Sequence, residues 1–318
     1  KMPELTDLFE VPAKILASKI EQHNKWLKDG SDPDAYKAIM NQALIQNYDF
    51  TGVDLTDSEF RKCKFVNCNF SKAQTDRISF VKCILEDCNF GGSNAGMADF
   101  KESSLIRCNF LGDEKVHLQF VSSTFEDCDF SNTKYYGAKF TECYLGGHDF
   151  SGSNLTGAIF TKCNLDDANF TDAMLREANF MYASCKGTNF TNANLITAVF
   201  TRAKLHGANL TDIKVDAIAG NNFEIKSAHI GGRHVTYTSG YVWIDCIQAP
   251  IKPFLAFKPS NMGPLEKVVE NNVKYNETAQ SAGYIIDTLS VDTMEWVENY
   301  IPIAIKLIKA SPAEETTH

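Results

Sequence analysis

Large apolar residues recur at every fifth position from Phe50 to Val215, and this spacing restricts the folds open to the chain. Of the 34 positions concerned, 30 hold Phe, Leu, Tyr or Val. An α-helix would scatter these side chains around its circumference, since five residues advance it roughly 140° beyond a full turn. A flat strand would send successive members to opposite faces. The spacing therefore predicts short extended segments separated by a corner every five residues, with the large side chains all pointing inward.

A second period, of twenty residues, predicts how the corners close into coils. Phe occupies every twentieth position from 50 to 190, and again every twentieth position from 60 to 200. The two sets lie ten residues apart, which places two Phe columns on opposite walls. An Asn/Asp column extends beside the first over 49–209. Small residues mostly occupy the position two before each large one and share its inward face. We predict an all-β solenoid of about eight 20-residue coils, stacked like parallel strands into a rod roughly 40 Å long, with a filled interior.

Two segments show the repeat most clearly, ANFTDAMLREANF at 168–180 and TNFTNANLITAVF at 188–200. They resemble the pentapeptide-repeat family, whose pattern is A(D/N)LxX. The resemblance covers residues 48–216 and implies a right-handed quadrilateral β-helix. It implies no particular activity, because function depends on the sites that a fold carries and not on the fold itself.

The segments on either side of the repeat are expected to cover its end coils, whose open edges would otherwise pair with other chains. We predict an N-terminal helical cap over 1–47, the β-helix over 48–216 and a small α+β C-terminal module over 217–318. Within the cap, residues 11–28 have apolar side chains at helical spacing, and a helix stop follows at Asp29-Gly30.

The cap also contains His23, Trp26 and Leu27, which resemble the lead-in of many bacterial and phage members of the family. We expect His23 to lie on the helix surface without a catalytic role.

The C-terminal module is predicted to contain a β-hairpin over 223–247 and helices over 263–309. Residues 235–244 alternate around Ser239-Gly240 as a hairpin requires. The last helix has an apolar stripe that either packs on the hairpin or the last coil, or forms a homodimer seam. The stripe comprises Met294, Val297, Ile301, Ile305 and Ile308.

Eight of the ten cysteines occupy the small inward position of the repeat. Ligands in a line about 4.8 Å apart cannot surround a tetrahedral zinc ion, so we expect no metal site. Parallel side-chain directions in stacked coils also disfavour disulfides. We interpret these cysteines as small, buried apolar fillers. They favour a reducing, bacterial cytoplasmic location, and delivery to another cell stays open.

Composition and motifs exclude several classes of function. The net charge is −9, and no basic segment indicates nucleic-acid binding. No apolar run is long enough for a membrane span, and Lys1–Glu10 lacks the pattern of a secretory signal. The sequence has no phosphate-binding loop, no HExxH and no CxxC. We therefore predict a protein that is not an enzyme and uses no cofactor.

One wall of the predicted solenoid departs from the repeat over four successive coils. Its central residues there are Thr75, Ala95, Lys115 and Tyr135, and Asp113 takes the small position beside Lys115. Unpaired buried charges are costly, so this stretch must bulge, pair its charges or open to solvent. It is either a recognition surface or a packing variation with an internal Asp113–Lys115 pair. The hypothetical surface comprises Arg77, Asn94, Met97, Asp113, Glu114, Lys115, His117, Lys134, Tyr135 and Tyr136.

Three functions are compatible with these features. The first is a non-enzymatic scaffold that presents its solenoid faces to a protein partner. The second follows from the resemblance, because some family members mimic DNA, bind gyrase (a type II topoisomerase) and modulate quinolone sensitivity. A DNA mimic needs charge of one sign, whereas residues 49–216 mix 17 basic with 22 acidic residues. The third is a delivered effector or toxin with its activity in residues 217–318.

Overall fold

The computed structural model describes most of the repeat and parts of the flanking segments. The described residues are 5–30, 39–93, 96–111, 118–215, 218–221, 225–230, 233–238, 241–244, 247–255, 304–305, 308–309 and 312–313.

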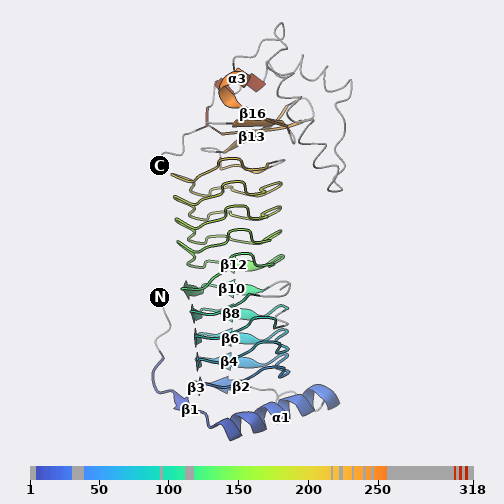
Figure 1. The fold of residues 1–318 in the computed structure, drawn as a ribbon, viewed down its shortest axis with the longest axis vertical. Helices are drawn as coiled ribbons and strands as arrows, with labels where there is room; N and C mark the ends of the chain where they lie inside the picture. Colours follow the sequence, from blue (N-terminus) through green and yellow to red (C-terminus); the bar gives the residue numbers. More distant parts are fainter. Residues whose placement is uncertain are drawn as a thin grey trace.

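Short strands and one long helix make up the described structure (Figure 1). The first elements along the chain are β1 (Phe9–Glu10), α1 (Ala13–Asp29), β2 (Ile39–Asn41) and β3 (Ala43–Gln46). The strands of the repeat are β4 (Glu59–Arg61), β5 (Lys64–Val66), β6 (Ser79–Val81), β7 (Ile84–Glu86), β8 (Asp99–Lys101), β9 (Ser104–Ile106), β10 (Gln119–Val121), β11 (Thr124–Glu126) and β12 (Lys139–Thr141). The last elements are β13 (Lys226–Ile230), β14 (Arg233–Tyr237), β15 (Tyr241–Ile244), β16 (Ile247–Pro250) and α3 (Ile251–Leu255).

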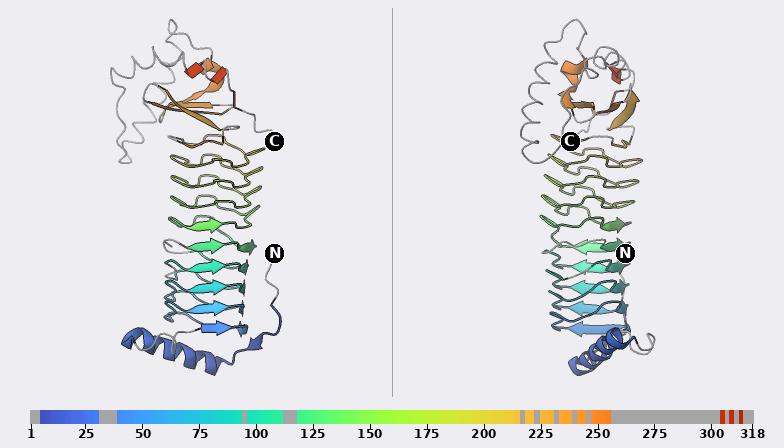
Figure 2. Two further views of the ribbon diagram at one scale, coloured as in Figure 1. Left: turned by 180° about the vertical axis from the view of Figure 1, so that it is seen from behind. Right: turned by 90° about the vertical axis from the view of Figure 1, so that its right-hand side faces the viewer.

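The repeat forms a parallel β-solenoid in which each coil pairs with the residues twenty positions further on. Phe60 in β4 pairs with Phe80 in β6, and single bridges continue this register as far as Val199 with Ala219. The strands make two six-stranded parallel sheets, in the orders β1-β3-β5-β7-β9-β11 and β12-β10-β8-β6-β4-β2. Figure 2 shows the coils stacked along one axis. The predicted fold class is therefore confirmed, whereas the count of about eight coils and the domain boundaries stay predictions.

The two Phe columns fill the interior as the twenty-residue period predicts. Phe70 and Phe90 stack with ring centroids 4.6 Å apart and an angle of 2° between their planes. Phe80 belongs to the other column and meets the edge of Phe70 at 6.1 Å. All three rings are fully buried. Parallel stacking at these centroid distances within a column, and edge contacts between columns, are both common aromatic geometries, so the columns form one continuous core.

Most corners are closed by a backbone hydrogen bond within the turn. The Ala173 N–H donates to the Phe170 carbonyl oxygen at 3.1 Å. The residue before the corner adds a second bond, because the Thr171 N–H donates to Oδ1 of Asn169 at 3.1 Å. The Asn/Asp column of the sequence thus caps its own turns, which is the use that short polar side chains commonly have in turns.

A second kind of corner lies next to the strands of the two sheets, and here a side chain from the next coil enters the turn. At the corner from Phe80 to Cys83, the Cys83 N–H donates to Oγ of Ser103 at 3.0 Å. The Ser103 hydroxyl in turn donates to the Phe80 carbonyl oxygen at 3.0 Å. Ser123 bridges the next corner in the same way, with its Oγ 2.7 Å from the Phe100 carbonyl oxygen. We call these corners open.

Thiols serve several of the other open corners, which refines the interpretation of cysteine as an apolar filler. The Cys83 thiol donates to the Phe60 carbonyl oxygen at 3.3 Å, and the Cys108 thiol donates to that of Leu85 at 3.3 Å. Nine cysteines are described, and all nine are free and buried. They therefore fill space, and several of them also satisfy backbone carbonyl groups that lack a turn hydrogen bond.

Helix α1 lies across the N-terminal end of the solenoid (Figure 1). It begins after Pro12 and ends at Gly30, whose left-handed backbone (φ 64°) lets its N–H donate to the Trp26 carbonyl oxygen, which agrees with the predicted stop. Leu16 and Ile20 join the core of the repeat. The expected surface position of His23 is wrong, because its side chain is fully buried, with Nε2 2.9 Å from the Thr56 carbonyl oxygen.

The C-terminal end carries a four-stranded antiparallel sheet in the order β13-β14-β15-β16, beyond the last coil in both views of Figure 2. The predicted hairpin is thus part of a larger sheet that extends to Pro250. Of the predicted apolar stripe, Ile305 and Ile308 are buried within the chain. Met294, Val297 and Ile301 lie outside the described residues, as does most of the segment predicted to be helical.

Candidate binding face on the solenoid wall

The hypothetical recognition surface on the irregular wall is described only in part. Asn94, Asp113, Glu114, Lys115 and His117 lie outside the described residues, and with them the predicted Asp113–Lys115 pair.

The described members of that surface differ in exposure. Met97 is 45% exposed, and Arg77 binds both carboxylate oxygens of Asp57 at 2.8 and 2.9 Å. Lys134 is exposed, and Tyr136 is half-buried with its hydroxyl oxygen accepting a hydrogen bond from Asn154 at 3.0 Å. These side chains are mostly engaged within the solenoid, so they offer little free polar surface.

Tyr135 does not belong to this surface. It is only 1% exposed, and its hydroxyl donates to the Phe110 carbonyl oxygen at 2.8 Å. Burial raises the pKa of this phenol well above its usual value, so it remains a neutral donor. The Phe110 and Phe130 rings beside it are 6.4 Å apart, compared with 4.6 Å for Phe70 and Phe90. The spacing between stacked Phe rings is therefore wider beside Tyr135. This residue contributes to packing and not to recognition.

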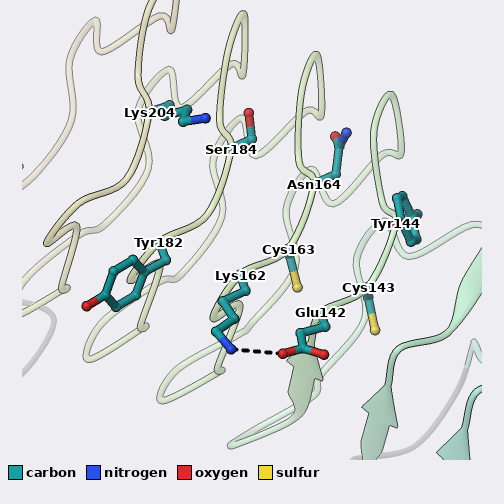
Figure 3. Close-up of a pocket in the computed structure, with 9 residues that line it drawn as sticks. All are labelled: Glu142, Cys143, Tyr144, Lys162, Cys163, Asn164, Tyr182, Ser184 and Lys204. Atoms are coloured by element: carbon teal, nitrogen blue, oxygen red, sulfur yellow. Dashed lines mark hydrogen bonds and ion pairs between the residues drawn. The ribbon is translucent and has the colours of Figure 1, made fainter.

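Another wall carries two exposed tyrosines around a hollow of about 390 Å³. Tyr144 is 57% and Tyr182 is 47% exposed. Figure 3 shows one row of side chains formed by Tyr144, Asn164, Ser184 and Lys204 on successive coils, and a second row formed by Glu142, Lys162 and Tyr182. Arg202 continues the second row by the twenty-residue register. We call these eight residues the Tyr144 face: Glu142, Tyr144, Lys162, Asn164, Tyr182, Ser184, Arg202 and Lys204.

The solenoid positions these side chains by its register. Tyr144 pairs with Asn164, Asn164 with Ser184, and Ser184 with Lys204, all in parallel bridges. Each of these residues directly precedes an inward residue and therefore points outward. The second row comes from the positive-φ residue of each corner, such as Lys162 at 59° and Tyr182 at 60°. Adjacent rows of outward side chains at a fixed spacing make a regular surface on a rigid support.

Charge is distributed unevenly along the Tyr144 face. Glu142 and Lys162 form an ion pair at 3.0 Å, and the hydrogen bond from Lys162 lowers the pKa of the Glu142 carboxyl group. Arg202 lies over the Tyr182 ring at 5.5 Å and donates to its hydroxyl oxygen at 3.2 Å. Lys204 forms no ion pair with any of the described residues. The far end of the face is therefore positive, and it combines cations with an aromatic ring.

The described residues offer little for catalysis. They contain no group of three or more His, Cys, Asp or Glu side chains placed to hold a metal ion. Cys143 and Cys163 line the hollow but are buried beneath it. Burial raises the pKa of the Cys163 thiol well above its usual value, which disfavours the reactive thiolate. Among the described helices, none has the length and apolar character needed to cross a membrane.

Sequence reasoning missed the Tyr144 face because it searched for departures from the inward pattern. The face departs only at outward positions, where any polar residue fits the repeat. One signal was available: no acidic residue occurs between Glu177 and Asp212, although the chain as a whole is acidic. Three basic residues lie in that interval, Lys186, Arg202 and Lys204.

Comparison with protein families matches two models of the same repeat. The model described as pentapeptide repeat region matches residues 118–184 and 153–230. The model described as pentapeptide repeats (8 copies) matches 38–74 and 83–112. Together the matched segments extend over more than half of the chain.

Several solved structures are similar to this chain at low identity. Trypsin-treated QnrB1, a plasmid-mediated fluoroquinolone resistance protein, is 22% identical over 56% of this chain and 84% of its own, with a TM-score of 0.33. HetL, a pentapeptide repeat protein involved in heterocyst differentiation regulation in the cyanobacterium Nostoc, is 20% identical over 59% and 93%, with a TM-score of 0.22. ORF18 of Geobacillus virus E2 is 13% identical over 65% and 53%, with a TM-score of 0.28. Among curated proteins the search found no match.

Proposed function

Because the chain belongs to the pentapeptide-repeat family, we propose that it is a non-enzymatic scaffold that binds a protein partner on the outer walls of its solenoid. Rows of outward side chains at fixed spacing suit this role, since a solenoid presents an extended and rigid surface.

The observation that carries the proposal is the filled interior. The Phe rings stack without interruption from Phe50 to Phe190 in one column, at centroid distances from 4.5 to 6.4 Å. A ligand therefore has to bind outside the coils. Small molecules usually bind in an enclosed, mostly apolar cavity, whereas the hollow on the Tyr144 face is open to solvent and lined mainly by polar residues of the described coils. A macromolecular partner suits such walls best.

The DNA-mimic alternative is less well supported by the charges of the described coils. Asp57 pairs with Arg77, while Glu86 and Asp87 both pair with Arg107. These pairs neutralise carboxylates on the corners, whereas a mimic of the phosphate backbone needs a continuous negative surface. The effector alternative concerns residues 217–318, of which only short segments are described, and it stays a prediction.

Photo-crosslinking in the full-length chain tests the scaffold function. A photoreactive amino acid at Tyr144 and, separately, at Met174 places one probe on each of two opposite walls, since both side chains are well exposed. We expect one wall to crosslink to a discrete protein partner in lysate of the source cells, while the opposite wall remains blank. Absence of any protein crosslink from either wall would contradict the proposal.

A supercoiling assay with purified gyrase, with and without a fluoroquinolone, distinguishes the DNA-mimic alternative from the general scaffold. We expect the protein to leave supercoiling unchanged. Inhibition of gyrase, or its protection from the drug, would favour the mimic over the general scaffold.

A further inference from the structure

We propose that the Tyr144 face binds a short acidic segment of a partner protein. This inference rests on the proposed scaffold function and specifies the chemistry of the partner.

The first observation is a pair of neighbouring cations, Arg202 and Lys204, at one end of the face. Among the described residues, the ion pairs join residues between Asp57 and Glu177. Arg202 and Lys204 lie beyond that interval, and no carboxylate among the described residues pairs with either of them. No acidic residue lies between Glu177 and Asp212. Two cations therefore lie two residues apart at this end of the face, with no carboxylate partner among the described residues, and both can bind an anion.

The second observation is that these cations border a hollow with aromatic sides. Lys204 lines the hollow, as do both exposed tyrosines. Arg202 packs over Tyr182, which orders the guanidinium group before any partner arrives. Tyrosine and arginine are the residues that most often dominate protein interfaces, because they combine a large contact area with directed hydrogen bonds. A hollow with this lining accommodates an extended segment that carries carboxylates and some apolar groups.

Charge complementarity selects a short acidic segment over a longer polyanion. The charged residues of the Tyr144 face are one acid, Glu142, and three bases, Lys162, Arg202 and Lys204. Asp166 adds a second carboxylate beside the face, where it accepts a hydrogen bond from the Ser184 hydroxyl at 2.6 Å. The positive charge is therefore concentrated at the Arg202–Lys204 end, although the whole chain carries −9. At physiological ionic strength charges act over only about 8 Å. A short segment therefore experiences mainly the local positive field. A nucleic acid that followed the wall would also meet the acidic remainder of the rod, which would repel it.

The test measures binding of a short labelled peptide of alternating Glu and Ala to the full-length protein by fluorescence anisotropy. The matching Gln-Ala peptide supplies the uncharged control. We expect the acidic peptide to bind and the neutral one not to bind. Replacing Lys204 by Glu should weaken binding of the acidic peptide about fivefold to tenfold, because reversing the exposed charge turns its attraction for the peptide carboxylates into repulsion.

Lys214 supplies a matched control substitution. It is an exposed lysine at the same position of the repeat, ten residues after Lys204, and so lies on the opposite wall. Lys214→Glu changes the net charge by the same amount and should leave peptide affinity within about twofold, because that wall lies beyond the screening distance. Thermal unfolding of both variants shows whether either change disturbs the fold.

Three results would overturn the inference. They are equal effects of Lys204→Glu and Lys214→Glu, equal binding of the two peptides, and tighter binding of a short oligothymidylate than of the acidic peptide. If crosslinking identifies a partner whose binding is insensitive to Lys204→Glu, this inference fails while the scaffold function stands. If no wall binds a protein, the scaffold function fails, and the peptide comparison still decides the charge preference of the face.

Discussion

The coils up to about Cys143 and the coils beyond it share one core but differ at their corners. In the first region two of the four corners of a coil are open, and a thiol or hydroxyl from the next coil bridges the turn, as Ser103 does at the corner of Phe80. In the second region the corners are closed by their own backbone, as in the bond from Ala173 to Phe170. Short three-residue strands occur only in the first region of the described repeat.

This difference shows that the small inward position has two physical roles. Alanine at this position packs against the core, and the turn is closed by its own backbone hydrogen bond. Serine or cysteine can also provide a donor and an acceptor to the corner of the preceding coil, as Ser103 does, which compensates for the lost turn bond and lets the chain stay extended. A buried N–H or carbonyl group must find a partner, and at the bridged open corners the neighbouring coil supplies one.

The largest expected effect tests whether the two regions really share one core. Phe90 and Phe170 each stack between two rings of their column, at 4.6 and 5.0 Å for Phe90 and at 4.8 and 5.4 Å for Phe170. Replacing either by Ala should lower the free energy of unfolding by about 3–5 kcal/mol, because the loss of a ring leaves a cavity. Chemical denaturation measures the change in the free energy of unfolding for both variants. A much smaller cost at one site would show that the regions differ in the core as well.

A smaller loss of stability tests the contrast between open and closed corners. Ser103→Ala removes the bridge of an open corner and leaves the Cys83 N–H and the Phe80 carbonyl without it, at a cost of about 1–3 kcal/mol. Ser153→Ala is the matched change at a closed corner, where the Ser153 N–H still donates to Phe150 at 3.2 Å. We expect that change to cost about 0.5 kcal/mol or less. Equal costs in denaturation experiments would refute the distinction between open and closed corners.

The smallest effect concerns pH and compares Asp99 with Asn179, which occupy the same column. At its closed corner Asn179 accepts a hydrogen bond from the Met181 N–H at 2.9 Å. Asp99 precedes an open corner, and its buried Oδ1 has no hydrogen-bond partner. Burial raises the pKa of Asp99 above its ordinary 3.8, and Lys101 offsets this only partly.

The folded state therefore holds the Asp99 proton more tightly than the unfolded chain does. Stability should fall as pH rises from 3.8 through the raised pKa. Asp99→Asn should remove this fall and raise the free energy of unfolding at neutral pH by less than about 1 kcal/mol. Asn179→Asp is the control, and we expect the opposite slope because the Met181 N–H would stabilise a carboxylate. Denaturation at several pH values checks both signs.

The sequence predicted the fold well because the repeat is local and redundant. Each Phe column contains eight members, and any one of them implies the same inward direction. The Asn/Asp column was recognised as well, although its role in capping the turns became clear only from bonds such as that between Thr171 and Asn169. His23 was placed wrongly because helical spacing shows which residues share a face but does not show what lies against that face.

The candidate site was predicted less well, because outward positions tolerate any polar residue. The irregular column that includes Tyr135 suggested a recognition surface, and the structure buries that tyrosine inside the coil. The Tyr144 face has no irregular spacing at all. Its residues become neighbours only when coils stack, and the hollow between Tyr144 and Lys204 depends on side chains sixty residues apart in sequence.

A period of five residues by itself dictates that the chain turns a corner after each large side chain, because no other regular backbone puts all of them inside. What it leaves open is how each corner is bonded and which outward residues become neighbours. Only the tertiary structure decides these points, since the donor that bridges the Phe80 corner belongs to Ser103, one coil further on. Contacts between coils, and not preferences within a coil, therefore determine the open corners and the charged wall.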